Sequence, residues 1–213
     1  MTQSLKKFAT YCLSILQKSF PDAHIELNYD KQEPWQLLVA VCLSAQSTDK
    51  KVNEVTPALF NKFKTINNFA NADILDLEAH IKILGLYKNK AKNLKLAAQQ
   101  ILTKFNGQVP NNRADLETLA GVGKKSSAVI VANAFNIPAI AVDTHVARIS
   151  QRLGLSKNTN PDKIEEDLSR LWPSNLWLIA HHTLIFHGRR ICFARKPNCL
   201  GCPLNNVCPK IDC

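Results

Sequence analysis

Four cysteines lie close together near the end of the chain, with the spacing Cys-x6-Cys-x2-Cys-x5-Cys. They are Cys192, Cys199, Cys202 and Cys208. Structural zinc sites usually take two short Cys or His pairs separated by a longer segment, whereas one Cys-x2-Cys flanked by single cysteines suits a [4Fe-4S] cluster better. The spacing therefore favours an iron-sulfur cluster, with zinc, disulfides or free thiols as the alternatives.

A redox Cys-x2-Cys pair at Cys199 and Cys202 is a weaker interpretation, because it leaves the two outer cysteines without a role and no strand pattern precedes it. The chain has seven cysteines in all. An odd number argues against a secreted disulfide framework, so we expect a reducing, cytoplasmic compartment. We expect the C-terminal Cys213 to be unligated.

The formal net charge of +10 indicates a polyanionic partner, because each Lys or Arg placed against a phosphate can release a condensed counterion. A merely basic protein without such a partner is the alternative. The N-terminal apolar residues recur at helical spacing and no cleavage site follows, so this segment is predicted to be an amphipathic helix rather than a signal peptide. No apolar run reaches the roughly 18 residues of a membrane span.

A glycine turn, Gly121-Val122-Gly123, lies between two helical stretches and is followed by Lys124 and Lys125. Such a turn leaves backbone N–H groups free at the start of the next helix, where a phosphate can bind. On its own the pattern is more often plain structure. Lys125, flanked by another lysine in the first helical turn, is a candidate nucleophile because a neutral amine attacks a carbon electrophile.

An aspartate, Asp143, lies where another helix is expected to begin, in the stretch Ala141 to Arg148. Taken alone, it is best interpreted as an N-cap that accepts an amide hydrogen two or three residues along. The hypothesis that links the two segments makes Lys125 the nucleophile and Asp143 its electrostatic and proton-handling partner.

The elements that must position these residues are predicted to be helices throughout. Val129–Val131 and 137–142 lean towards strand, but neither can build a sheet. The fold class expected is therefore all-α, with helices at the N-terminus and over Trp35–Gln46, Lys88–Phe105, Ile164–Leu171 and Asn175–His187.

Several motifs together resemble the endonuclease III family, the iron-sulfur branch of the helix-hairpin-helix DNA glycosylases. The likeness runs in order over about the whole chain. Its motifs are Leu43–Asp49, Leu84–Tyr87, Gly121–Lys125, Ala141–His145, His187–Arg189 and the four cysteines.

This resemblance implies two helical domains with a DNA-binding cleft between them. Residues 27–137 would form a helical barrel that contains the helix-hairpin-helix turn. Residues 1–26 and 138–213 would form a discontinuous domain, with the cluster loop at 192–208. The cluster would be structural or DNA-contacting, and the cationic side chains of its segment would point towards the DNA backbone.

The resemblance also implies roles for single residues. Lys125 would be the catalytic amine and Asp143 the essential carboxylate. Gln46 would fill the space of the expelled base while Leu86 props the stack open, although Gln46 could instead simply end a helix and Leu86 could be core. Further DNA contacts are expected from Asp49, Gly121, Gly123, His145 and Arg189.

The activity implied is base excision repair: removal of oxidised pyrimidines from duplex DNA, then β-elimination at the abasic site through a lysine Schiff base. The partner would be double-stranded DNA that contains damaged bases or abasic sites, and the protein would be a monomer without membrane association. Rival interpretations are a monofunctional glycosylase of a related branch, a non-catalytic iron-sulfur DNA-binding module and a redox sensor. Lys125 argues against the adenine-excising and thymine-mismatch branches, which tend to lack it.

Two positions depart from the common family pattern. Ala120 replaces a frequent proline, which should loosen the turn slightly, and Ala128 replaces a frequent asparagine, which removes a possible hydrogen bond. Neither change touches the expected chemistry. His181 and His182 are expected to be core or helix-surface residues rather than ligands, because the four cysteines already complete a site.

Overall fold

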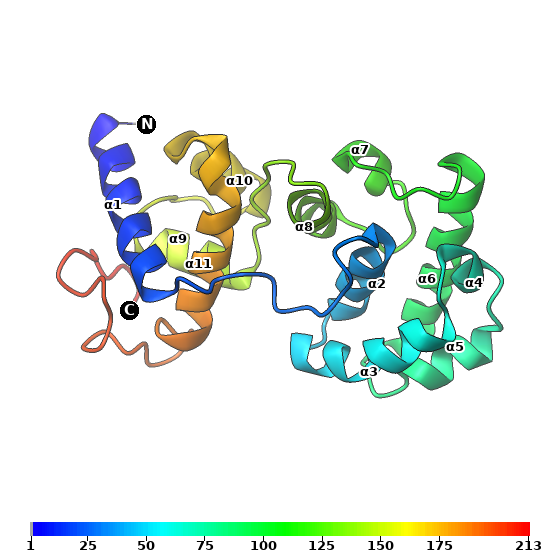
Figure 1. The fold of residues 1–213 in the computed structure, drawn as a ribbon. Coiled ribbons are helices and arrows are strands. Elements are labelled where there is room, and N and C mark those ends of the chain that lie inside the picture. Colours follow the sequence, from blue (N-terminus) through cyan, green and yellow to red (C-terminus); the bar gives the residue numbers. More distant parts are fainter. Residues whose placement is uncertain (1) are drawn as a thin grey trace. The chain divides into compact units, whose positions relative to one another are not determined.

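The protein, described from Thr2 to Cys213 in a computed structural model, is all-helical, and no β-strand occurs within that range (Figure 1). This confirms the expected fold class. In chain order the helices are α1 (Gln3–Ser19), α2 (Pro34–Ser44), α3 (Asp49–Lys62), α4 (Ile66–Ala70), α5 (Ile74–Ile81), α6 (Tyr87–Lys104), α7 (Arg113–Leu116), α8 (Lys124–Ala134), α9 (Thr144–Arg152), α10 (Pro161–Leu171), a 3-10 turn η1 (Ser174–Leu176) and α11 (Trp177–Arg190).

The helices form two compact units. One unit is continuous and spans Glu26–Ile137, so it holds α2 to α8. The other is discontinuous and combines the residues up to Ile25 with Pro138–Cys213, so it joins α1 to α9, α10, α11 and the cysteine loop. Lys125 belongs to the continuous unit and Asp143 to the discontinuous unit.

Helix α2 is the centre of the continuous unit. Seven consecutive residues from Leu37 to Leu43 are buried, so the helix is surrounded on all sides. A helix that is apolar all round must be covered by neighbours, and α3, α6 and α8 supply that cover. The glycine turn and α8 are therefore built directly on the core of this unit.

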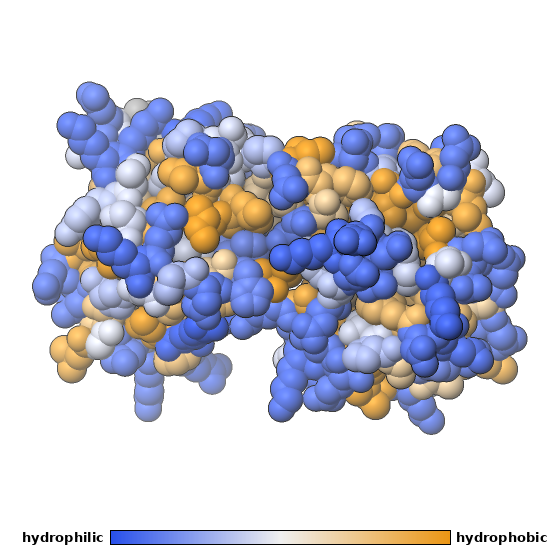
Figure 2. Space-filling view, viewed as in Figure 1, coloured by the Kyte–Doolittle hydropathy of each residue, from blue (hydrophilic) through white to orange (hydrophobic). Residues whose placement is uncertain are grey.

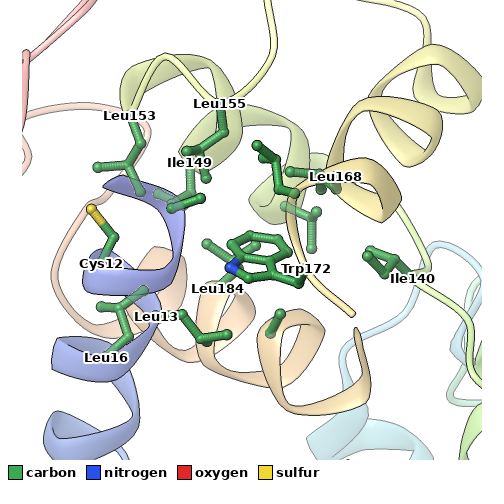
Figure 3. Close-up of a cluster of buried hydrophobic side chains, with 14 of the residues drawn as sticks. Cys12, Leu13, Leu16, Ile140, Ile149, Leu153, Leu155, Leu168, Trp172 and Leu184 are labelled. Atoms are coloured by element: carbon green, nitrogen blue, oxygen red, sulfur yellow. The ribbon is translucent and has the colours of Figure 1, made fainter. Parts of the chain in front are cut away.

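The discontinuous unit has an apolar core of its own. Cys12, Leu13 and Leu16 of α1 pack there with Ile149 of α9 and Leu184 of α11 (Figure 3). Leu204 from the cysteine loop is buried in the same core, and Cys192, Cys202 and Cys208 pack against it. The loop is thus part of the folded unit and not an appended tail.

The helix boundaries differ from the predicted ones in ways that matter for the site. Helix α2 ends at Ser44 instead of Gln46, because Ala45, with ψ of 116°, already leaves the helical conformation, and Gln46 follows with a left-handed φ of 54°. Gln46 therefore lies in the turn that ends the helix, in agreement with the alternative interpretation, and this position is compatible with a role in DNA binding. Helix α11 continues beyond His187 to Arg190. The strand-leaning Val129–Val131 lies inside α8, and 137–142 has no regular structure.

Helix α6 ends as its sequence predicts. The N–H of Phe105 and the N–H of Gly107 both donate to the carbonyl of Ile101, and Gly107 is left-handed with φ of 77°. This closure satisfies a terminal carbonyl that would otherwise lack a partner.

Hydrophilic side chains cover most of the face shown in Figure 2, with smaller apolar patches between them. Among the described residues, no helix is long and apolar enough to cross a membrane.

Candidate active site

The glycine turn fixes where Lys125 lies. Gly121 has φ of 81°, a left-handed conformation that disfavours any side chain. A Cβ at this position would also lie 3.1 Å from the Cβ of Asn93 on α6. Gly123 is the N-cap of α8 and brings no side chain to the first-turn N–H groups. A phosphate is the ligand that such donors and the positive end of the helix dipole favour.

Helix α6 supports the turn through Gln100. The side-chain oxygen of Gln100 accepts the N–H of Ala120 at 2.8 Å, and its side-chain nitrogen donates to the carbonyl of Thr118 at 3.3 Å. A proline at position 120 would have no N–H to donate. Ala120, which we expected only to loosen the turn, therefore makes a hydrogen bond that braces it.

Lys125 is the second residue of α8, and its side chain is exposed. The helix below it is anchored by Ser127, a buried residue whose hydroxyl donates to Oε1 of Glu117 at 2.6 Å and to the carbonyl of Lys124 at 2.8 Å. The amine thus extends from a well-anchored first turn. This is the arrangement that a nucleophile needs if it must reach a bound substrate.

Asp143 is the N-cap of α9. Its Oδ1 accepts the N–H of Val146 at 2.8 Å, and the residue is half-buried. The capping interpretation is therefore confirmed, but it does not exclude a second role. The cap fixes the position of the carboxylate at the N-terminus of α9.

His145 lies one residue into α9 and is held by its neighbours. Its Nδ1 lies 3.2 Å from Nη2 of Arg148, and the same Nη2 donates to the carbonyl of Gly188 at 2.9 Å. Burial lowers the pKa of His145 from its usual value; Asp143 acts against this shift, while Arg148 and Arg189 add to it. Burial at this position therefore favours the neutral form of the imidazole.

Gly188 on α11 allows this close approach. A Cβ there would lie 3.1 Å from Nη2 of Arg148 and 3.1 Å from both the Cβ and the Nδ1 of His145. The helix that carries Asp143 and His145 is therefore packed against α11 at a point where a larger side chain would force a shift. Arg189 follows in the last turn of α11 and is half-buried.

Gln46 and Leu86 occupy the tips of two turns in the continuous unit. Both have left-handed backbones, with φ of 54° and 58°, and both side chains are exposed. Leu86 is 56% exposed, so the interpretation of Leu86 as core is wrong. Exposed non-glycine residues in this conformation are uncommon and gather at functional sites. Asp49, which follows Gln46 closely in the sequence, is half-buried and is the first residue of α3.

The cysteine loop surrounds a cavity. Cys192, Cys199, Cys202 and Cys208 all line it, and its empty volume is about 360 Å³, part of it open to solvent. Cys213, which we expect to be unligated, also borders the cavity. Within the part of the chain that the structure describes, no three His, Cys, Asp or Glu side chains are grouped as ligands of a metal ion. All seven cysteines are free thiols.

The surroundings of these sulfurs suit a thiolate-bound cluster. The N–H of Leu204 donates to Sγ of Cys202 at 3.4 Å, and the N–H of Lys210 donates to Sγ of Cys208 at 3.3 Å. Arg152 places Nη1 3.3 Å from Sγ of Cys192. Such donors stabilise ligand sulfurs and tune the group that they bind. Four thiols, backbone donors and a guanidinium therefore fit a [4Fe-4S] group.

Sequence reasoning did not single out Arg148 and Arg152, which are one turn apart on α9. Arg148 donates to the carbonyl of Cys192 at 3.0 Å, and Arg152 donates to the carbonyl of Phe193 at 2.7 Å. Both side chains join α9 to the start of the cysteine loop. The sequence shows that the two arginines are spaced i, i+4, but it does not show that their partners are the carbonyls of Cys192 and Phe193, far along the chain.

His181 and His182 are buried in α11, as expected of core residues. Burial, with His181 and His24 nearby, lowers the pKa of His182 to about 3.

Comparison with known proteins identifies the family. The profile of the HhH-GPD superfamily of base excision DNA repair proteins matches residues 39–174. Endonuclease III of Synechocystis sp. is 47% identical over 207 residues, which cover 97% of this chain and 94% of that protein. Endonuclease III of Escherichia coli (strain K12) is 39% identical over 92% of each chain. A solved structure of a trapped endonuclease III–DNA covalent intermediate matches with a TM-score of 0.92 and 43% identity, over 99% of this chain and 97% of that chain.

This chain belongs to the endonuclease III family. It is accordingly a base excision repair enzyme, a DNA glycosylase with abasic-site lyase activity. A thermostable thymine-DNA glycosylase has the same fold, with a TM-score of 0.86 at 23% identity.

Proposed function

We propose that the protein removes oxidised pyrimidines from duplex DNA and then cleaves the abasic site by β-elimination through a Schiff base on Lys125. The observation that carries the proposal is the exposed Lys125 amine in the first turn of α8, directly after the glycine turn. It occurs in a chain 43% identical to an endonuclease III that was trapped as a covalent intermediate with DNA.

In the first step, Nζ of Lys125 attacks C1′ of the damaged nucleotide and forms a C–N bond. The glycosidic bond breaks, and its electron pair leaves with the base, which takes up a proton. Positive charge develops on the sugar as the base departs. The carboxylate of Asp143, fixed as the N-cap of α9, stabilises that charge.

In the second step, the sugar ring opens and leaves an iminium between Lys125 and C1′. The iminium acidifies the C2′ proton. A base removes this proton, the electron pair forms the C2′–C3′ double bond, and the C3′–O bond breaks to release the 3′ phosphate. Water then hydrolyses the iminium and frees the amine.

Extrusion of the damaged nucleotide leaves a gap that costs a few kcal/mol of stacking. We assign Gln46 to fill the gap and Leu86 to keep the neighbouring bases apart. Their exposed positions at two turn tips support this assignment. Asp49, Gly121, Gly123, His145 and Arg189 are the further DNA contacts that we propose.

We further propose that Cys192, Cys199, Cys202 and Cys208 hold a [4Fe-4S] cluster. When bound, the cluster would cross-link the two ends and the middle of the loop to one another, and no step of the excision chemistry passes through it. We expect the enzyme to act as a monomer in the cytoplasm, where thiols stay reduced. Its net charge of +10 supports binding to the DNA backbone.

Borohydride trapping tests the proposal directly. The purified protein is mixed with duplex DNA that carries thymine glycol or an abasic site, and borohydride reduces any iminium to a stable covalent complex. We expect a complex on both substrates, and its loss in Lys125→Gln. Lys124→Gln is the matched control, because it removes the neighbouring charge and leaves the proposed nucleophile.

Two results would contradict the assignment. Full activity of Lys125→Gln would remove the lysine from the chemistry. Tight binding to the damaged duplex without any trapped complex would indicate a monofunctional glycosylase or a binding module.

A further inference from the structure

The two turns that carry Gln46 and Leu86 lie next to each other in the continuous unit. A Cβ built on Gly85 would be 3.8 Å from the carbonyl oxygen of Gln46. Both turns hold a non-glycine residue with positive φ. Such conformations cost about 1 kcal/mol or more and persist only where the surrounding structure enforces them. Something must therefore hold the two turns in place.

Lys90, in the first turns of α6, contacts both turns. Its backbone N–H donates to the carbonyl of Leu86 at 3.0 Å, which begins the helix. Its side-chain Nζ donates to Oγ of Ser47 at 2.7 Å. Ser47 directly follows Gln46. Lys90 therefore links Leu86, the N-cap of α6, to the turn that carries Gln46.

The burial of Lys90 distinguishes it from the other lysines of this helix. Lys90 is 7% exposed, whereas Lys88 and Lys92 are exposed. Lysine is almost never buried without a partner, because taking its charge out of water is costly. Burial also lowers the pKa of Lys90 from its usual value. A side chain in this setting is poorly placed to bind a DNA phosphate.

We propose that Lys90 is a positioning residue for base extrusion: through its bond to Ser47 it holds Gln46 at a fixed spacing from Leu86, so that both enter the duplex together. This inference rests on the proposed function and assigns the part of the site that sets the geometry of the gap. In this role Lys90 acts through Ser47 and needs no contact with the sugar or the departing base. Its loss should impair extrusion and leave the lysine chemistry intact.

The test compares two substrates with the cluster-containing, full-length protein. One is duplex DNA with thymine glycol, which requires extrusion. The other is single-stranded DNA with a preformed abasic site, which has no stack to open but still requires Lys125. We expect Lys90→Met to lower kcat on the duplex by about tenfold to a hundredfold, as misplacement on the ångström scale does. Borohydride trapping on the single strand should stay within about twofold, because that reaction bypasses the misplaced pair.

Three variants sharpen the comparison. Lys92→Met removes the same charge from an exposed position on α6 and should leave the duplex kcat near that of the unmodified protein. Ser47→Ala removes only the acceptor and should lower the duplex kcat in the same direction as Lys90→Met. Lys90→Arg can still donate to Ser47 and should restore part of the loss. A 2-aminopurine placed beside the lesion should fluoresce less with Lys90→Met, because fewer bases are unstacked.

Equal losses on the two substrates would overturn the inference, and so would a duplex loss no larger than that of Lys92→Met. If Lys90→Met does not fold, Ser47→Ala decides alone, and an unchanged duplex kcat in that variant overturns the inference. Failure of the proposed function is a separate result, because the unmodified protein would then trap on neither substrate.

Discussion

At the scale of single residues, Asp143 combines an observed role as a helix cap with a proposed catalytic role, and the two can be separated. Its Oδ1 accepts the N–H of Val146, which caps α9, and its charge is proposed to stabilise the sugar as the base leaves. Asparagine caps a helix about as well as aspartate does, but it carries no charge. The two variants Asp143→Asn and Asp143→Ala therefore remove one role or both.

We expect Asp143→Asn to unfold at nearly the temperature of the unmodified protein, yet to excise thymine glycol about a hundredfold more slowly, as when a group that stabilises developing charge is lost. Asp143→Ala should lose excision equally and should also cost about 1 kcal/mol of stability through the lost cap. Thermal melts and single-turnover excision measure the two effects. Excision at full rate by Asp143→Asn would reduce the residue to a cap.

A second residue-scale prediction concerns the two glycines of the turn. Gly121→Ala would force a left-handed alanine and place its Cβ 3.1 Å from that of Asn93. We expect a loss of about 1–3 kcal/mol of stability and slower Schiff-base formation, because the turn that positions Lys125 must shift. Urea unfolding and borohydride trapping measure the two effects.

Gly123→Ala is the matched control. A Cβ at Gly123 has nothing within 4 Å, and its φ of −104° is open to any residue. Alanine is a poorer N-cap, but it lowers the entropy of the unfolded chain, and the two effects offset each other to within about 0.5 kcal/mol. If both variants lost the same stability, the conformation of Gly121 would not be what restricts it to glycine.

At the scale of elements, α6 is the common support of the two functional turns in its unit. Lys90 holds the turn that carries Gln46, and Gln100 holds the glycine turn through Ala120 and Thr118. Asn93 lies against Gly121 between them. These residues recur at intervals of three and seven along the helix, so they share one face. The helix thereby connects the two residues proposed to enter the duplex with the turn that carries the proposed nucleophile, Lys125.

The sequence predicted this helix but not its role. Its apolar spacing and its Asn-Gly ending are local signals, and the structure confirms both within a residue or two. The all-helical fold followed from the same kind of signal. The bracing contacts of Lys90 and Gln100 join residues 43 and 18–20 positions apart, and no periodicity reports such pairs. The sequence alone does not show whether a given lysine is buried or exposed.

In the candidate site too, local motifs could be recognised from the sequence, whereas features that depend on distant parts of the chain could not. The glycine turn, Asp143 and the four cysteines are compact motifs whose residue types limit the chemistry, so they could be singled out directly. Gln46 and Leu86 could not be assigned without the family resemblance, because their exposed, left-handed positions depend on how α2 ends and α6 begins. Arg148 was missed because its partners, Gly188 and Cys192, come from a distant helix and loop.

At the scale of the whole molecule, each unit has its own core. The apolar core of the discontinuous unit contains Cys12 from α1 and Leu204 from the cysteine loop, and its members all belong to that unit. Cys42, in contrast, is buried in α2 of the continuous unit. Protein segments with separate cores tend to open as separate cooperative units. A change to the cysteine loop should therefore be felt in only one of them.

Hydrogen exchange measured by mass spectrometry tests this expectation with Cys208→Ser, a variant that removes one proposed ligand. Because Cys208 packs against the core that α1, α9 and α11 share, we expect amides in these helices to exchange at least about tenfold faster, while α2, α6 and α8 keep their protection. Cys42→Ser is the reciprocal control: it places a hydroxyl in the core of the continuous unit and should reverse the pattern. Faster exchange throughout the chain in both variants would mean that the two units unfold as one, and the cluster would then support the lysine-bearing unit as well.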